Sequence, residues 1–131
     1  MSAEAGFVVC LVATLGFLAG TVASGLRAKR RVHILCVLGA VACLVATIHY
    51  AREVGTHFDL ASAGWITPVH LWIAKIATGA YLLPAASGLR TIFVPSTRRL
   101  HRKLAFLTLS LTVLAAVTGV WMLLAAQRLP G

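Results

Sequence analysis

Acidic residues are the scarcest group in this chain. Asp and Glu together account for 3 of the 131 residues, whereas Lys and Arg account for 12. The three acids, Glu4, Glu53 and Asp59, all fall outside the long apolar runs. Catalysis by paired carboxylates or by a nucleophile, base and acid needs such groups held together in one site. The sequence therefore lacks the parts of these hydrolase and transferase mechanisms, and an electron carrier or an assembly factor is a better expectation than a stand-alone enzyme.

Cysteine is also sparse, and its placement excludes a secreted disulfide framework. Cys10, Cys36 and Cys43 all lie inside apolar runs, and a buried thiol usually packs as a small hydrophobic group. Cys36 and Cys43 are seven residues apart and share a helix face. A soft metal site with a third ligand is therefore the alternative to simple packing.

Long apolar runs dominate what remains. Hydrophobic residues make up 60% of the chain, charged residues 11%, and the mean hydropathy is +0.91. A spanning helix needs about 20 apolar residues, and windows of that length occupy residues 7–26, 32–51, 68–89 and 104–126. Lipid cannot satisfy free backbone groups, so these spans must be helical. The prediction is an all-α integral membrane protein, a single domain forming an antiparallel four-helix bundle.

Basic residues lie at one end of the predicted spans. Four follow the first span and five surround the connection between the third and the fourth, so nine of the twelve share one side: Arg27, Lys29, Arg30, Arg31, Arg90, Arg98, Arg99, Arg102 and Lys103. The positive-inside tendency makes that side cytoplasmic, with both termini and the loop 52–67 outside. The first span is expected to be an uncleaved anchor. The net charge of +9 is then expected to meet anionic membrane lipid and no nucleic acid.

Local features refine this bundle. Pro84 should remove one backbone hydrogen bond and kink the third span. Small residues, including Gly79 and Gly119, should permit close helix contact or leave room for a flat macrocycle. Four threonines are expected to bond carbonyls of their own helices, namely Thr78, Thr108, Thr112 and Thr118. Four aromatic residues are expected at the outer boundary, as aromatic rings often are, namely Tyr50, Trp65, Trp72 and Trp121.

Four of the five histidines lie at the ends of the spans. His33 and His101 are expected near the cytoplasmic face, whereas His49 and His70 are expected near the outer face. His57 lies in the outer loop, where it is either solvated or a lid. Ionisable groups within spans are uncommon and tend to mark function. The four histidines therefore predict two stacked candidate sites.

Haem suits two histidines at each level. A haem iron takes axial imidazoles from opposite faces of the macrocycle, so facing helices that each offer one histidine could hold it. The expectation is one or two haem b groups. Copper is the alternative, although copper and zinc usually take three or four protein ligands. Lys75, five residues after His70, could bind a haem propionate, or its long side chain could reach toward the outer surface.

The spacing of His33 and His49 constrains this arrangement. The two residues are 16 positions apart, which on a straight helix separates them by about 24 Å and by about 160° of rotation. They cannot both face one bundle axis. Either the helix is irregular before Gly39, or the two histidines serve different neighbours, or one of them is not a ligand.

The segments around the four histidines resemble a known family. They are RRVHILCVLGA, IHYAREVGTHF, VHLWIAKIATGAYLLP and HRKLAFLTLSLTVLAAVTGVWMLL, and their order and spacing resemble the CtaM/YozB family of four-helix membrane proteins. The resemblance implies a bacterial inner-membrane protein linked to the maturation or function of haem-copper terminal oxidases, with His33, His49, His70 and His101 as cofactor or metal ligands. A looser architectural likeness is to the diheme cytochromes b.

Three function classes remain open at this point. The first is a haem b protein that transfers electrons in a respiratory chain, with a quinone as a candidate partner. The second is an assembly factor that handles haem or copper for a terminal oxidase. The third is a cofactor-free accessory subunit of a respiratory complex.

Overall fold

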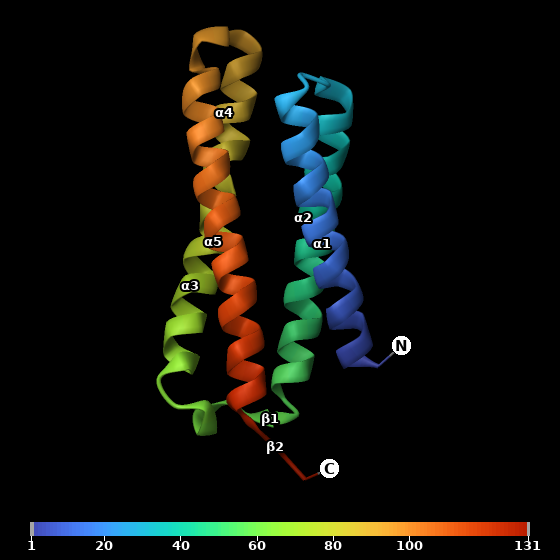
Figure 1. Ribbon diagram of the computed structural model, residues 1–131, viewed down its shortest axis with the longest axis vertical. Helices are drawn as coiled ribbons and strands as arrows, with labels where there is room; N and C mark the ends of the chain where they lie inside the picture. The colour runs from blue at the N-terminus through green and yellow to red at the C-terminus, as the bar shows by residue number, and fades with distance from the viewer. Residues whose placement is uncertain (1, 131) are drawn as a thin grey trace. The chain divides into compact units, whose positions relative to one another are not determined.

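The protein is almost entirely helical. The computed structural model describes residues 2–130, and its helices are α1 (Ala3–Leu26), α2 (Arg30–Gly55), α3 (Ile66–Ala80), α4 (Leu82–Phe93) and α5 (Arg98–Ala125) (Figure 1). Short 3-10 helices, η1 (Leu60–Ala63) and η2 (Pro95–Thr97), and two-residue strands, β1 (Phe58–Asp59) and β2 (Gln127–Arg128), lie in the connections. The strands pair as a two-stranded sheet. The all-α prediction is confirmed.

Four helical stretches are long and apolar enough to cross a membrane. They are Ala3–Leu26, Arg30–Gly55, Ile66–Phe93 and Pro95–Ala125, and they contain the first three predicted spans and all but the last residue of the fourth. The observed stretches extend beyond most of the predicted ends because basic and polar residues such as those at 98–103 continue the helix into the head-group region. The protein is therefore a multi-pass membrane protein with four candidate spans.

The chain forms two compact units. Unit 1 contains residues up to Phe58 together with Leu129 and Pro130, and unit 2 contains Asp59–Arg128. Unit 1 is a hairpin of α1 and α2, and unit 2 is a hairpin of α3 and α4 against α5. Each unit thus holds two of the four spans.

Contacts in unit 1 follow an antiparallel register. Tyr50 lies against Gly6, and Phe17 lies against Gly39. The hydroxyls of Thr14 and Thr47 are 3.2 Å apart between these two contacts. Because the residue numbers of each pair add up to nearly the same value, α1 and α2 run side by side in opposite directions. Glycine at the close approaches lets a ring pack on the facing backbone.

The helices of unit 2 are also packed antiparallel. Trp65 and Trp121 meet edge to face with ring centroids 5.4 Å apart, and Tyr81 lies beside Thr112 at 3.1 Å between their oxygens. The hydrogen-bonded pairs His70–Thr118, Ala80–Thr108 and Ser87–His101 each have residue numbers that add up to 188, as expected when α5 runs antiparallel to α3 and α4. The two tryptophans fall at the end of unit 2 where the sequence predicted the outer boundary.

The burial pattern is the reverse of that in a water-soluble protein. Leu124 is 82% exposed and Phe93 is 77% exposed, whereas Thr14 and Thr108 are 1% and 3% exposed. Lipid solvates large apolar side chains, so helix contacts in membranes favour small and weakly polar residues. This pattern independently supports the membrane interpretation.

Pro84 explains the break in the third span. The helix is interrupted at Tyr81, between α3 and α4, and Pro84 is the third residue of α4. Proline has no N–H, so the carbonyl of Ala80, four residues earlier, lacks its usual backbone donor. The hydroxyl of Thr108 on α5 donates to that carbonyl at 3.1 Å. The predicted interruption is present, and a side chain from the facing helix satisfies the carbonyl that it leaves free.

The threonine prediction is corrected at one position. Thr78, Thr112 and Thr118 donate to carbonyls of their own helices, as expected. Thr108 instead donates to α3, because the Ala80 carbonyl offers an acceptor that a helix without proline would not leave open.

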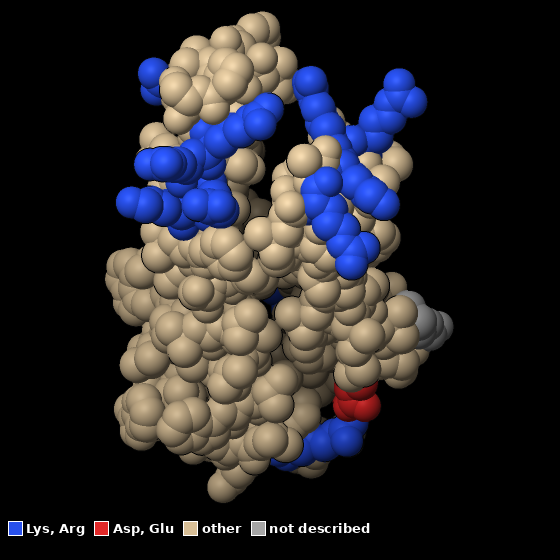
Figure 2. Space-filling model, turned by 45° about the horizontal axis from the view of Figure 1, so that its top comes forward, with Lys and Arg blue, Asp and Glu red and all other residues tan. Residues whose placement is uncertain are grey.

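Basic side chains gather near the connected end of each hairpin (Figure 2). In unit 1 they flank the turn from α1 to α2, and in unit 2 they flank the turn from α4 to α5. The cytoplasmic location of these turns, expected from the positive-inside tendency, stays a prediction.

Replacing Thr108 with Val should lower the free energy of unfolding by about 0.5–1.5 kcal/mol, because the Ala80 carbonyl then loses its donor. Detergent-induced unfolding of the purified protein measures this change. Ser110→Ala is the matched control, since Ser110 is exposed and bonds only to Phe106 in its own helix. In a Pro84→Ala background the restored N–H should make Thr108→Val less costly, and an undiminished cost would contradict this account.

Candidate histidine sites

Three of the five histidines pack inside their own hairpin. His33 lies in the first turn of α2, His70 near the start of α3 and His101 near the start of α5. All three rings are partly buried. In each case the Nδ1 atom meets a polar group on the facing helix, and the ring lies over a glycine.

His33 is held by a backbone carbonyl. Its Nδ1 lies 2.9 Å from the carbonyl oxygen of Thr21 on α1. A Cβ added at Gly25 would lie 3.2 Å from the same nitrogen. Any residue other than glycine at position 25 would therefore crowd the His33 ring. A carbonyl oxygen can only accept, so Nδ1 must carry the hydrogen.

His70 is held by a hydroxyl. Its Nδ1 lies 3.1 Å from Oγ1 of Thr118 on α5, while Thr118 donates its hydrogen to the carbonyl of Leu114 at 2.8 Å. The hydroxyl has one hydrogen, so its oxygen accepts from Nδ1 of His70. A Cβ on Gly119 would lie 2.8 Å from Cε1 of His70. The predicted role of Gly119 in close helix contact is confirmed.

His101 follows the same pattern in the other half of unit 2. Its Nδ1 lies 3.1 Å from Oγ of Ser87 on α4, and Ser87 also lies 3.4 Å from the carbonyl of Pro84. With the Ser87 hydrogen directed to that carbonyl, Nδ1 of His101 is the donor. A Cβ on Gly88 would lie 3.1 Å from Cε1 of His101.

A short sequence pattern is shared by the three glycines on which these histidine rings pack. Each histidine faces a glycine that follows a serine or a threonine, at Ser24–Gly25, Ser87–Gly88 and Thr118–Gly119. The dipeptides were not recognised as functional from the sequence, because their meaning depends on which helix faces them. Antiparallel pairing of the spans would have placed each one opposite its histidine.

The contacts at Nδ1 fit the same tautomer in all three rings, with the hydrogen on Nδ1. A neutral imidazole with its hydrogen on Nδ1 carries its lone pair on Nε2. Histidines that bind metals commonly donate their other N–H to a carbonyl or a similar acceptor, which fixes the ring and raises the basicity of the ligating nitrogen. Each of the three rings therefore has the second hydrogen bond that an Nε2 ligand requires.

His49 differs from the other three. It lies on the exposed side of α2, its Nε2 is 3.4 Å from a carboxylate oxygen of Glu53, and its ring centroid is 5.5 Å from that of Tyr50. Helix α2 runs unbroken from Arg30 to Gly55, so the suggestion of an irregular helix before Gly39 is wrong. His33 faces α1 while His49 does not, as their spacing predicts.

The other predicted site residues lie outside these three histidine contacts. His57 is exposed in the loop after α2. The ammonium of Lys75 lies 5.4 Å from the ring centroid of Trp72, one turn nearer the start of α3. This cation–π contact supports the alternative in which Lys75 reaches toward the outer surface. Cys10, Cys36 and Cys43 are free and partly buried, in keeping with packing.

Metal ligands do not cluster within residues 2–130: no group of three or more His, Cys, Asp or Glu side chains could hold a metal ion. The predicted pairs, His33 with His101 and His49 with His70, each take one histidine from unit 1 and one from unit 2. The pairing stays a prediction.

Comparison of the chain with protein-family models, with curated proteins and with solved structures found no match.

Gly119→Ala should displace the His70 ring and lower the free energy of unfolding by about 1–3 kcal/mol, as overpacking does. Gly79→Ala is the matched control on α3, because a Cβ on Gly79 meets open space; it should be neutral. Detergent-induced unfolding measures both variants. Equal tolerance of the two substitutions would show that the ring does not rest on Gly119.

Proposed function

We propose that the protein binds haem b in the bacterial inner membrane through Nε2 of its span-end histidines and transfers electrons in a respiratory chain. The observation that carries the proposal is the shared Nδ1 anchoring of His33, His70 and His101 on the facing helix. Metal-binding histidines commonly make a hydrogen bond of this kind with their other ring nitrogen. His49 lacks this anchoring, and its Nε2 lies 3.4 Å from Glu53, so it enters the proposal from the sequence alone.

The donor chemistry fits haem better than a multi-ligand metal site. Haem brings four nitrogens of its own and asks the protein for one or two axial imidazoles. Copper and zinc sites usually take three or four protein ligands, and residues 2–130 contain no such group.

Each predicted site residue would have one role in haem binding. His33 and His101 serve one level and His49 and His70 serve the other, while Lys75 is the candidate partner for a propionate. Bound haem would supply a one-electron carrier whose potential depends on its axial ligands and their hydrogen bonds. Thr21, Ser87 and Thr118 hold the imidazoles in position, and the exposed apolar side chains keep the sites in lipid.

The respiratory role rests on the resemblance of the four histidine segments to CtaM/YozB proteins. It makes a terminal oxidase or another respiratory complex the partner to test first, with a quinone as a candidate electron donor. Handling of haem during oxidase assembly would use the same ligands. The two roles differ in whether the haem stays bound.

Visible spectroscopy tests the haem proposal directly. The purified protein should be red, with sharp bands on reduction. His70→Ala or His49→Ala should remove one spectral component, and His33→Ala or His101→Ala another. His57→Ala is the matched control and should keep full haem content, since His57 is an exposed loop residue. Full haem content in all four span-end variants, or a colourless protein with stoichiometric copper, would contradict the proposal.

Thr118→Val tests the anchoring of His70 separately from its ligation. Valine keeps the size but removes the acceptor for Nδ1, so the imidazole becomes less basic and freer to rotate. We expect haem to remain bound and the midpoint potential to rise, as measured by redox titration. Thr78→Val is the control, because Thr78 bonds only to Ala74 in its own helix. An unchanged potential in Thr118→Val would assign Thr118 a packing role alone.

A further inference from the structure

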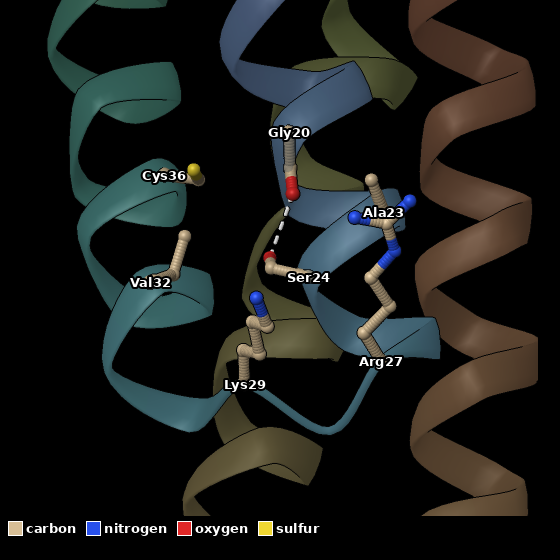
Figure 3. A pocket seen from close by; sticks show the side chains of 7 residues that line it. All are labelled: Gly20, Ala23, Ser24, Arg27, Lys29, Val32 and Cys36. Carbon is tan, nitrogen blue, oxygen red and sulfur yellow. Dashed lines mark hydrogen bonds between the residues drawn. The ribbon is translucent and has the colours of Figure 1, made fainter.

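Unit 1 contains a pocket that the histidine sites do not use. It has a volume of about 250 Å³ and lies between α1 and α2, beside the turn that connects them (Figure 3). Seven residues line it: Gly20, Ala23, Ser24, Arg27, Lys29, Val32 and Cys36. The pocket combines a mainly apolar floor with two cationic side chains at the helix ends.

The floor of the pocket offers little to a polar ligand. The hydroxyl of Ser24 is 2.6 Å from the carbonyl of Gly20 in its own helix, so its hydrogen is already used. Cys36 packs against Gly20, where an added Cβ would lie 3.0 Å from its sulfur. Apolar surface of this kind, made of Gly20, Ala23, Val32 and Cys36, suits hydrocarbon.

The turn between α1 and α2 directs the two cations toward this floor. Ala28 has a φ of 54°, which reverses the chain so that the backbone N–H of Lys29 donates to the carbonyl of Ser24 at 3.0 Å. Figure 3 shows the Lys29 amine directed toward Ser24 and the Arg27 guanidinium beside Ala23. Both residues line the pocket, and both are exposed, so their charges are accessible to a ligand there.

Among residues 2–130, each of the three acidic side chains is far from Arg27 and Lys29. Glu4 lies in the first turn of α1 and Glu53 in the last turn of α2, both at the opposite ends of these helices. Helix α1 has 24 residues and is therefore about 36 Å long. Asp59 follows the end of α2 by four residues, which keeps it within about 14 Å of that far end. Within residues 2–130, Arg27 and Lys29 therefore have no acidic side chain nearby to act as their counterion.

We infer that this pocket binds one anionic phospholipid. The phosphate lies between Arg27 and Lys29, and the hydrocarbon next to it lies on the apolar floor. The site is where α1 leaves the predicted span, at the depth of lipid head groups, and basic residues at that depth attract anionic lipid. The volume is below the about 300–1,000 Å³ of pockets that enclose a whole drug-sized ligand, so only the head-group end of the lipid enters.

Alkylation of Cys36 reports occupancy of the pocket. A Cys10→Ala/Cys43→Ala protein, with Cys36 as its one thiol, is placed in nanodiscs of phosphatidylcholine with increasing fractions of phosphatidylglycerol. The rate of reaction with a maleimide should fall as phosphatidylglycerol fills the site. Two basic contacts predict a preference of about 30-fold for the anionic lipid, so a small fraction of it should protect Cys36.

Two double substitutions distinguish lipid binding at this pocket from a general attraction of basic residues to an anionic membrane surface. Arg27→Gln/Lys29→Gln should abolish protection at the lipid fraction that half-protects the parent protein. Arg30→Gln/Arg31→Gln removes the same charge from neighbouring residues that do not line the pocket, and should leave protection in place. Ala23→Leu fills the floor without changing the charge and should also reduce protection, while circular dichroism verifies that each variant keeps its helices.

Three results would overturn the inference. Equal loss of protection in the two charge pairs would indicate diffuse attraction to the membrane surface. Equal alkylation rates in the two lipids would show that the pocket does not select anionic lipid. Protection by inorganic phosphate or glycerol phosphate in pure phosphatidylcholine nanodiscs would identify a soluble phosphate, not a lipid, as the ligand.

Discussion

The constraint on which this structure depends is that each polar group inside a membrane needs a partner within the protein. A carbonyl without its donor costs far more in lipid than in water. Pro84 shows the constraint locally, because it frees the carbonyl of Ala80 and Thr108 from the facing helix satisfies it. The break at Tyr81 thereby becomes a point where α5 is tied to the third span. A sequence feature that would weaken an isolated helix thus fixes the register of a hairpin.

The need of polar groups for a partner within the protein also applies to the histidines. An imidazole placed between two helices in lipid must bond at both nitrogens or leave one for a ligand. His33, His70 and His101 each bond the facing helix through Nδ1, and the glycine beneath each ring removes the side chain that would hold the helices apart. Sites built on helices in this way hold their geometry better than sites on loops. Rigid orientation of the rings is thus a consequence of how the hairpins pack.

Sequence reasoning predicted the spans well because hydropathy and length alone decide whether a helix can cross a membrane. It also placed the four span-end histidines and the interruption at Pro84. It assigned Thr108 to its own helix, since nothing in the local sequence shows which hydroxyl will meet the carbonyl freed by Pro84. Sequence reasoning also did not identify the glycines that lie under the histidine rings. His70 and Thr118, for example, are 48 residues apart and become neighbours only through the register of α3 against α5.

The amino-acid order by itself determined that the chain enters the membrane, where each span lies, and which end of each hairpin carries the positive charge. Those properties depend on the solvent preference of one segment at a time, so no contact between segments is needed to read them. Only the tertiary structure decided which partner each partly buried imidazole has: a carbonyl of α1 for His33, and hydroxyls for His70 and His101. Hydrogen bonds act over about 3 Å, so the packing register, and not the composition of a segment, selects the partner.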